Sequence, residues 1–260
     1  MHAVYSGGPA GAGWTQQPTI PGHVMATAIA PLIALSAAAA PVAAVSAPPW
    51  MAPLKKALQH GGTQRQKRSR SEAKRKHVQL ATVCPETGRP AVRTVVFRGF
   101  HGDSCLMAFV TDSRSDKVRH IRGGATQVEC CWWLDEAGVQ FRIAGRAVLC
   151  LLDSEEHELR SAAADAWDRL SSSTRETFTW PQPGASVDSS SAQYHKEPPA
   201  SYAEAGHFCL LIVIPEVVDE LRLGGRQRRV IYTSEVMRDQ ADEQHLLVNP
   251  VAWTAREVNP

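Results

Sequence analysis

The hydrophobic pattern between residues 77 and 152 predicts short β-strands joined by tight turns. Apolar and β-branched residues run together or alternate, and turn segments such as Pro85–Pro90 and Asp135–Gly138 separate them. The expected strands are residues 77–84, 91–100, 105–111, 126–134 and 139–152. One short helix, residues 116–122, interrupts them and ends at a Gly pair. Strands joined by tight turns indicate an antiparallel meander rather than βαβ units.

The chain after residue 152 predicts another helix and more strands. Residues 153–170 have a helical pattern, with Ser154 available as the cap at its start. Residues 171–205 are polar and rich in Ser and Pro, which predicts a long surface excursion. Three strands are then expected, at residues 208–214, 216–223 and 228–233. We therefore expect a mainly β (α+β) domain, a closed or half-closed barrel of six or more antiparallel strands with peripheral helices.

An amphipathic helix is expected at the start of this domain, over residues 49–58. Trp50, Leu54 and Leu58 fall on one face of that helix, as they would if it covered a core. We therefore place the folded domain at residues 49–260 and treat residues 1–48 as a disordered leader.

The charge distribution gives this leader a candidate role. Residues 1–71 contain six Lys or Arg and no Asp or Glu, whereas all 26 acids follow. An acid-poor segment rich in Ala, Ser and Thr favours an organelle transit peptide, plastid before mitochondrion, with a cytoplasmic protein as the alternative. An unaddressed tail, or a true start at Met25, also fits. Pro31 and Pro41 interrupt the Ala-rich run 26–45, so we expect no membrane span.

Two other compositional features predict no special chemistry. The run 65–76 holds seven basic residues, but no aromatic residue lies between them to stack on bases. We expect a solvated helix or linker there and no nucleic-acid partner. The six cysteines form no Cys-x-x-Cys pair, so we expect small buried residues and no metal site.

The candidate chemistry lies in cations that interrupt or follow apolar strands. The familiar nucleophile, phosphate-loop and metalloprotease motifs do not occur in the sequence, so no catalytic side chain is predicted. Arg93 and Arg142 lie within strands, and Lys117 follows the third strand after Ser115. A cation within a strand faces solvent, an acid or an anionic ligand, because burying it unpaired is costly. Arg93, Ser115 and Lys117 lie on adjacent elements, which predicts a phosphate site.

Five short motifs carry a resemblance to a known family. They are Arg93-Thr-Val-Val-Phe-Arg98, Phe109-Val-Thr-Asp-Ser-Arg-Ser-Asp-Lys117, Trp132-Trp133 with Gln140-Phe-Arg-Ile-Ala-Gly145, Arg229-Val-Ile-Tyr232 and Trp253-Thr-Ala-Arg-Glu-Val-Asn-Pro260. Together they resemble the pyridoxamine 5′-phosphate oxidase-like flavoproteins, in particular the branch with the Alr4036-type FMN-binding domain. The resemblance runs from about Pro48 to the end. It implies a split β-barrel that binds FMN and forms a homodimer with FMN at the interface.

The resemblance also implies roles for particular residues. Arg93 and Lys117 would hold the FMN phosphate, with Ser115 and Arg114 assisting. The remaining FMN contacts would be Thr111 beside the ribityl chain, Val95 and Val96 along the ring, Gln140 from the partner subunit, and Arg229 near the pyrimidine side. A dianionic phosphate does favour guanidinium and ammonium groups, which agrees with these residue types.

The substrate site departs from the family pattern. Arg98 stands where the family has a substrate-binding Lys, residues 224–229 contain no His, and Leu221 replaces a flavin-contacting Trp. Arg93 and Arg98 are five residues apart, so they share a site only if the strand bulges. We expect an FMN-dependent oxidoreductase, with oxidation of pyridoxamine or pyridoxine 5′-phosphate by O2 as the leading reaction. The alternatives are a flavin-dependent reductase with another substrate and a non-catalytic FMN- or haem-binding barrel.

Overall fold

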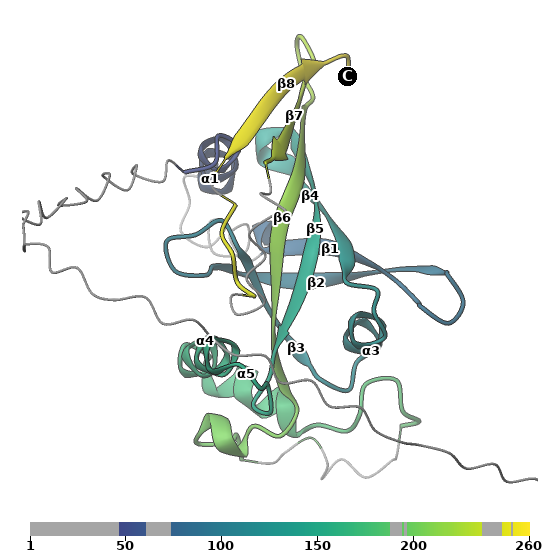
Figure 1. The fold of residues 1–260 in the computed structure, drawn as a ribbon, viewed down its shortest axis with the longest axis vertical. Helices are drawn as coiled ribbons and strands as arrows, with labels where there is room; N and C mark the ends of the chain where they lie inside the picture. Colours follow the sequence, from purple (N-terminus) through teal and green to yellow (C-terminus); the bar gives the residue numbers. More distant parts are fainter. Residues whose placement is uncertain (1–46, 61–73, 188–193, 195–196, 236–245, 251) are drawn as a thin grey trace, which may run out of the picture. The chain divides into compact units, whose positions relative to one another are not determined.

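Six antiparallel strands close into a barrel in the computed structural model of the chain (Figure 1). The strands are β1 (His77–Val83), β2 (Pro90–Phe100), β3 (Met107–Asp112), β4 (Gln127–Leu134), β5 (Val139–Cys150) and β6 (Phe208–Arg222). Their order is β3-β2-β1-β4-β5-β6, and pairing of β3 with β6 closes the circle. The predicted antiparallel barrel is therefore confirmed.

The structure describes residues 47–60, 74–187, 194, 197–235, 246–250 and 252–260. They lie in one unit, which spans Ala44–Pro260. The predicted leader, apart from residues 47 and 48, and most of the basic run 65–76 lie outside the described residues.

Two further strands extend the sheet beyond the barrel. β7 (Arg228–Ser234) pairs with the second half of β6, and β8 (Trp253–Val258) pairs with β7. The Trp253–Pro260 ending is a motif in the sequence, but its strand was not predicted.

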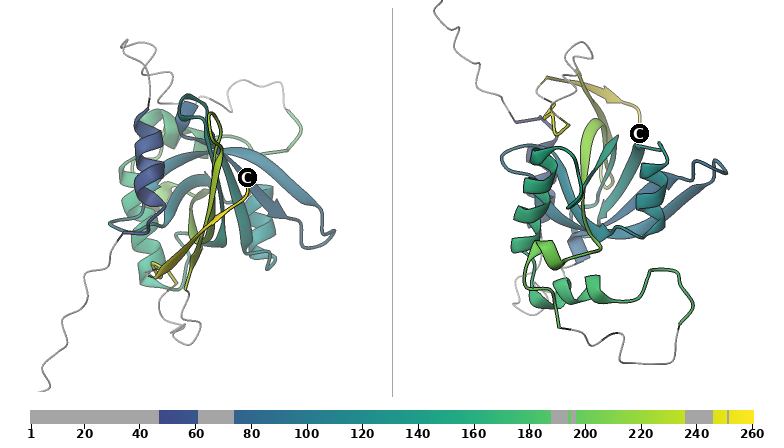
Figure 2. Two further views of the ribbon diagram at one scale, coloured as in Figure 1. Left: turned by 90° about the horizontal axis from the view of Figure 1, so that it is seen from above. Right: turned by 60° about the horizontal axis from the view of Figure 1, so that its bottom comes forward.

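Helices flank the barrel at several points. They are α1 (Met51–Gln59), α3 (Asp116–Arg122), α4 (His157–Asp168) and α5 (Ser172–Glu176), with short 3-10 turns η1 (Asp135–Ala137), η2 (Thr177–Thr179) and η4 (Tyr202–Glu204). Figure 2 shows α3 and α4 on opposite sides of the barrel. α3 contacts β1 and β5, whereas α4 contacts β5 and β6.

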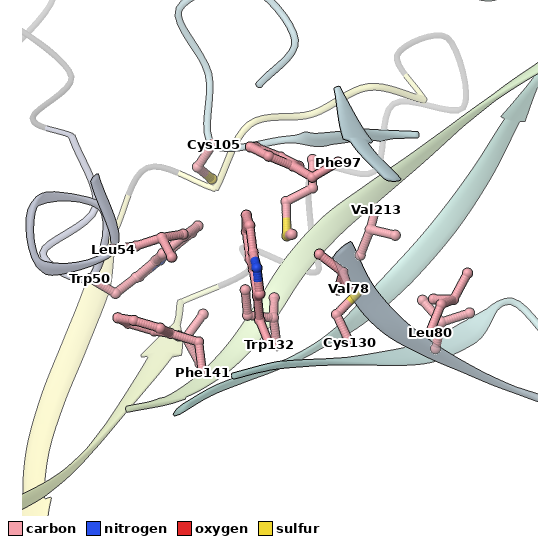
Figure 3. Packing of buried hydrophobic residues seen from close by; sticks show 14 of the residues in the cluster. Trp50, Leu54, Val78, Leu80, Phe97, Cys105, Cys130, Trp132, Phe141 and Val213 are labelled. Atoms are coloured by element: carbon pink, nitrogen blue, oxygen red, sulfur yellow. The ribbon is translucent and has the colours of Figure 1, made fainter. Parts of the chain in front are cut away.

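The barrel interior forms the main core. Trp132 lies at its centre, and Figure 3 shows Leu54 of α1 and Trp50, the residue just before α1, beside it. All three side chains are fully buried, as the amphipathic pattern of residues 49–58 predicts. Trp50 also packs edge-on against Trp253, with 5.8 Å between ring centroids. Burial of each such side chain stabilises the fold by about 2–3 kcal/mol, so α1 is an integral part of the barrel.

A second core covers the outer face of β3, β5 and β6. Trp167 of α4 packs against Phe178 and Phe208, and Tyr202 packs against Phe208 from the far end of the excursion. The predicted surface excursion 171–205 is therefore tied down near both of its ends. This anchoring places residues 174–186 beside β3.

Two predicted strands, 208–214 and 216–223, are one continuous strand. The prediction of a break was wrong. Pro215 cannot donate to a ladder, and a proline normally ends a central strand, but β6 continues through it. Here Pro215 lies opposite Gly145 at a register shift, where the second partner of β6 changes from β3 to β7. A Cβ at Gly145 would lie 2.0 Å from the Ile214 carbonyl oxygen, so only glycine permits this close approach.

The predicted helix 153–170 is shorter than expected, and Ser154 does not cap it. α4 begins at His157, and the Ser154 hydroxyl accepts a hydrogen bond from the Leu151 backbone N–H instead. Side-chain bonds of this kind compete with helix starts because they offer the backbone another partner.

Among the described residues, no helix is long and apolar enough to cross a membrane. The same part of the chain contains no group of three or more His, Cys, Asp or Glu side chains suited to a metal ion. All six cysteines are free, and Cys105, Cys130, Cys150 and Cys209 are buried.

Candidate functional site

A cluster of cations and hydroxyls forms where β3 leads into α3. Lys117 donates from Nζ to the Thr111 hydroxyl at 2.8 Å and to the Ser115 hydroxyl at 3.0 Å. Ser115 immediately precedes α3, but its hydroxyl donates back to the Asp112 carbonyl oxygen at 2.7 Å. The tight turn after β3 thus brings together three of the predicted site residues.

Arg93 completes this cluster from the adjacent strand β2. It shares the inward face of β2 with Val95 and Phe97, which are both buried. Its Nη1 donates to the carbonyl oxygens of Leu80 and Ala91 and to the Thr82 hydroxyl. We refer to Arg93, Thr111, Ser115 and Lys117 as the cation cradle.

The cradle carries positive charge without a carboxylate partner. Among the described residues, no Asp or Glu lies within ion-pair distance of Arg93 or Lys117. Burial lowers the pKa of Lys117, and the nearby Arg93 charge lowers it further. Burial also lowers the pKa of Arg93. Two partly desolvated cations this close together favour the binding of an anion.

Arg114 belongs to a different arrangement. Its guanidinium forms an ion pair with Asp112 at 2.6 Å and donates to the Trp180 carbonyl oxygen at 2.9 Å. Arg114 therefore pairs with Asp112 and links β3 to the excursion. Asp112 makes no ion pair with Lys117, although its charge acts to raise the Lys117 pKa.

Arg98 lies at a bulge in β2. The pairing of β2 with β3 shifts register between Phe97 and Gly99, but this bulge does not bring Arg98 to the inward side that Arg93 shares with Val95 and Phe97. Arg98 lines two cavities, one of about 470 Å³ beside residues 174–186 and one of about 330 Å³ beside α4. The first cavity also includes Thr111, so Arg98 and this one residue of the cradle share a cavity wall.

Gln140 and Arg229 lie on a different face of the sheet. A single row of cross-strand neighbours runs over β4 to β8, namely Trp133, Gln140, Leu221, Arg229 and Val258. Directly opposed residues point to the same side, so this row forms part of the outer face of the sheet. Val96 is on the outward side of β2, whereas its neighbour Val95 is in the core. The predicted FMN residues therefore divide between two faces of the chain.

Arg229 has a carboxylate partner on this outer face. Asp219 accepts from Arg229 at 2.8 and 3.0 Å and from Arg142 at 2.7 Å. Burial raises the pKa of the Asp219 carboxyl, but the hydrogen bonds from Arg229 and Arg142 outweigh it and hold the pKa below its ordinary value. Arg229 is thus held in a fixed position by a buried acid.

Two residues beside the cradle were missed from the sequence. Thr82 and His120 are almost fully buried, and the Thr82 hydroxyl lies 2.9 Å from His120 Nδ1. A Thr in an apolar strand and a single His on a short helix give no recognisable signal. Their pairing depends on the contact between β1 and α3, which no local pattern predicts.

Comparison with known proteins identifies the family. A family model described as the FMN-binding domain of pyridoxamine 5′-phosphate oxidase matches residues 47–150. Pyridoxine/pyridoxamine 5′-phosphate oxidase 2 of Arabidopsis thaliana is 31% identical over 184 residues, which cover 71% of this chain and 87% of that protein. The chain belongs to the pyridoxamine 5′-phosphate oxidase-like FMN-binding family.

One solved structure supports the same assignment, and a second shares the fold. A pyridoxamine 5′-phosphate oxidase-related, FMN-binding protein of Nostoc punctiforme is 34% identical, with a TM-score of 0.70 over 83% of this chain and all of that one. PhzG of Burkholderia lata shares the fold, with a TM-score of 0.56 and 18% identity over 81% of this chain and 89% of that one. The predicted resemblance to this family is therefore confirmed.

The cradle fits the phosphate of FMN on its own chemistry. Within the described residues, Arg93 Nε and Nη2 make no hydrogen bond, so three N–H groups of this guanidinium have no protein acceptor. Lys117 supplies the second charge, and the Thr111 and Ser115 hydroxyls lie beside it. A phosphate dianion matches this combination of fork-shaped and point-like donors.

Proposed function

We propose that this protein binds FMN at the cation cradle and uses it to oxidise a small phosphorylated substrate, with pyridoxamine or pyridoxine 5′-phosphate as the leading candidates and O2 as the electron acceptor. The single observation that carries this proposal is the pair of Arg93 and Lys117, which have no carboxylate partner among the described residues. Family membership supplies the cofactor, since the matching domain is FMN-binding.

The residues of this chain would bind and orient the reactants. FMN, when bound, supplies the group that accepts a hydride and returns electrons to O2. Arg93 and Lys117 would fix its phosphate, and the Thr111 hydroxyl would lie beside the ribityl chain. Arg98 would bind the substrate's anionic group from the shared cavity wall, where burial already lowers the pKa of its guanidinium. An anion there would offset this desolvation.

We also propose a homodimer in which each FMN contacts both chains. Gln140 lies on the outer face of the sheet, whereas Arg93 and Lys117 belong to the inward-facing cradle, so one chain does not direct all three at one ligand. The outer face carries Trp133, which is 42% exposed, beside the Arg142–Asp219–Arg229 network. In the dimer, the partner subunit's Gln140 would reach the flavin held by this chain's cradle.

A second candidate function is a flavin-dependent reductase with another substrate. The segment between β6 and β7 favours it, because residues 224–229 contain three Arg and no His to grip a pyridine ring. Leu221, opposite Arg229, gives that wall an aliphatic side chain where a flavin-contacting Trp would be expected.

Anaerobic mixing separates these functions. The purified protein should be yellow and should release FMN on heating, and pyridoxine 5′-phosphate should bleach the flavin absorbance without O2. A colourless protein that binds no added FMN would overturn the whole proposal. A yellow protein that pyridoxine and pyridoxamine 5′-phosphates leave oxidised would retain FMN binding and favour the reductase. Light scattering of the same sample tests the dimer, and a monomeric holoprotein would overturn it.

We propose organelle import for the leader, with a plastid before a mitochondrion. The absence of Asp and Glu from residues 1–71 supports this proposal. A fluorescent protein fused after residue 48 should enter plastids in plant cells. Mitochondrial or diffuse cytoplasmic fluorescence would contradict the plastid assignment.

A further inference from the structure

Hydrogen bonds from one edge of the guanidinium, at Nη1, hold Arg93 in its orientation. Nη1 donates to three acceptors, the carbonyl oxygens of Leu80 at 3.1 Å and Ala91 at 2.8 Å and the Thr82 hydroxyl at 2.8 Å. Because Nη1 carries only two hydrogens, these bonds occupy it fully. The opposite edge, Nε–H and the Nη2 amino group, remains available to an anion.

Thr82 is the side chain among these three acceptors. The two carbonyl oxygens belong to paired strands, β1 and β2, and the ladder fixes their positions. The Thr82 hydroxyl depends instead on its own rotamer and on its other partner, His120. Thr82 lies opposite Ala91 in the ladder and is 1% exposed, so no solvent replaces a lost partner there.

His120 fixes that hydroxyl from α3. Arg119 Nη2 lies 3.4 Å from His120 Nε2, and a guanidinium nitrogen only donates, so we assign Nε2 as an acceptor. The ring proton then sits on Nδ1 and is donated to Thr82 Oγ1. The Thr82 oxygen accepts from both His120 and Arg93, which uses both of its lone pairs. Arg119 is itself held by Glu86 at 3.0 Å and Asp116 at 3.2 Å.

We propose that Thr82 and His120 are positioning residues that hold Arg93 with its free edge toward the phosphate of FMN. This inference rests on the proposed cradle. Their hydrogen bonds lead to Arg93, from His120 to Thr82 and from Thr82 to the guanidinium, so each would act through Arg93. Loss of the Thr82 hydroxyl would release one of three tethers and let the guanidinium rotate. The consequence is confined to the phosphate and leaves contacts with the flavin ring unchanged.

Comparison of FMN with riboflavin isolates this effect, since riboflavin has the same ring without the phosphate. We expect the wild type to bind FMN at least about 100-fold more tightly than riboflavin, measured by flavin fluorescence quenching. Thr82→Val removes the hydroxyl at constant shape and should raise the Kd for FMN about tenfold. Its Kd for riboflavin should stay within about twofold of the wild type. Thr82→Ser restores the hydroxyl and should recover FMN affinity to within about threefold.

His120 variants give an independent test of the same chain of contacts. His120→Asn keeps a polar group near the Nδ1 position, whereas His120→Leu does not, so Asn should retain more FMN preference than Leu. If Thr82→Val does not fold, this pair decides the inference. Equal weakening of FMN and riboflavin binding would indicate a merely structural role and overturn the inference. An unchanged ratio of the two Kd values in Thr82→Val would overturn it as well. A wild type that binds neither flavin would refute the proposed function instead.

Discussion

Replacement of Lys117 by Met should separate ligand binding from stability. The ammonium makes hydrogen bonds to two hydroxyls, and a third N–H remains for a ligand. The two hydroxyls keep other hydrogen-bond partners when the ammonium is removed. Ser115 still donates to the Asp112 carbonyl oxygen, and its hydroxyl lies 3.3 Å from the Thr111 hydroxyl. Lys117→Met therefore loses a charged donor without opening a cavity.

The expected effect on FMN binding is large, and the expected effect on stability is small. A hydrogen bond from a charged group to phosphate contributes about 1.5–3 kcal/mol, so Kd for FMN should rise about 10- to 150-fold. In the protein without FMN, the variant loses two hydrogen bonds to neutral oxygens and gains relief from a desolvated charge beside Arg93. These contributions offset each other to within about 1 kcal/mol, or about 2–4 °C in Tm for a domain of this size.

The pH dependence of stability gives a further check on Lys117. Burial lowers its pKa in the folded protein from 10.5, so between the lowered value and 10.5 the unfolded chain binds more protons than the folded one. The stability of the FMN-free wild type relative to Lys117→Met should therefore rise as the pH increases toward 10.5. The destabilising contribution of the charged ammonium is fully present below the folded pKa.

Titration with FMN and thermal melts of the FMN-free proteins measure both effects. Lys56→Met is the matched control, because Lys56 is an exposed residue of α1. That variant should bind FMN as the wild type does. An unchanged Kd in Lys117→Met would refute the phosphate assignment, and a loss of more than about 2 kcal/mol without FMN would show that Lys117 is mainly structural.

Three further predictions concern the scaffold. Gly145→Ala should destabilise the fold by about 3 kcal/mol in urea unfolding, because its Cβ would lie 2.0 Å from the Ile214 carbonyl oxygen. The control Gly206→Ala, where no atom lies within 4 Å of the added Cβ, should cost less than about 0.5 kcal/mol. Equal costs would contradict the close approach of the two strands at Gly145. Asp219→Asn should cost about 1–3 kcal/mol at neutral pH. The carboxylate's contribution is present above the ordinary pKa of 3.8 and is lost as the pH falls through the lowered folded pKa, so melts of the two proteins should converge in acid, and a constant gap would refute the ion-pair argument. Ellman's reagent should modify no more than two thiols of the native protein, Cys84 and Cys131. Burial raises the pKa of the other four thiols, to about 12 for Cys105, Cys130 and Cys150, and in the same direction for Cys209. Rapid reaction of a third thiol would contradict this burial.

Local parts of the fold and site could be predicted because their determinants are local. The strands β1 to β5 are joined by short connections, of which the one between β3 and β4 contains α3, and alternation of more and less buried positions marks strands such as β1 and β4. Thr111, Ser115 and Lys117 lie within seven consecutive residues, so the turn between β3 and α3 is enough to bring them together. The continuity of β6 through Pro215 was not predictable in this way, since it depends on partners that change from β3 to β7.

The outer-face row shows a second limit of sequence reasoning. Gln140 and Arg229 are neighbours of Leu221 only because the registers of β5, β6 and β7 agree. A shift of one residue in either pairing would put one of them in the core. The Arg98 bulge is likewise set by the pairing of β2 with β3, although the five-residue spacing from Arg93 already indicated that either a bulge or a separate site was needed.

The arginines of the predicted site differ mainly in which acids lie beside them. Arg114 is paired with Asp112, and Arg229 is paired with Asp219, whereas Arg93 has no acid partner among the described residues. A paired guanidinium still donates hydrogen bonds, but its charge is already balanced, so it suits a neutral edge such as the flavin pyrimidine better than a dianion. Arg93 and Lys117 are both partly buried, make no ion pair among the described residues and lie in one cluster, whereas Arg98, whose pKa burial also lowers, stands apart from them. The phosphate assignment therefore depends on which cations lack an acid neighbour, and that depends on contacts between strands distant in the sequence.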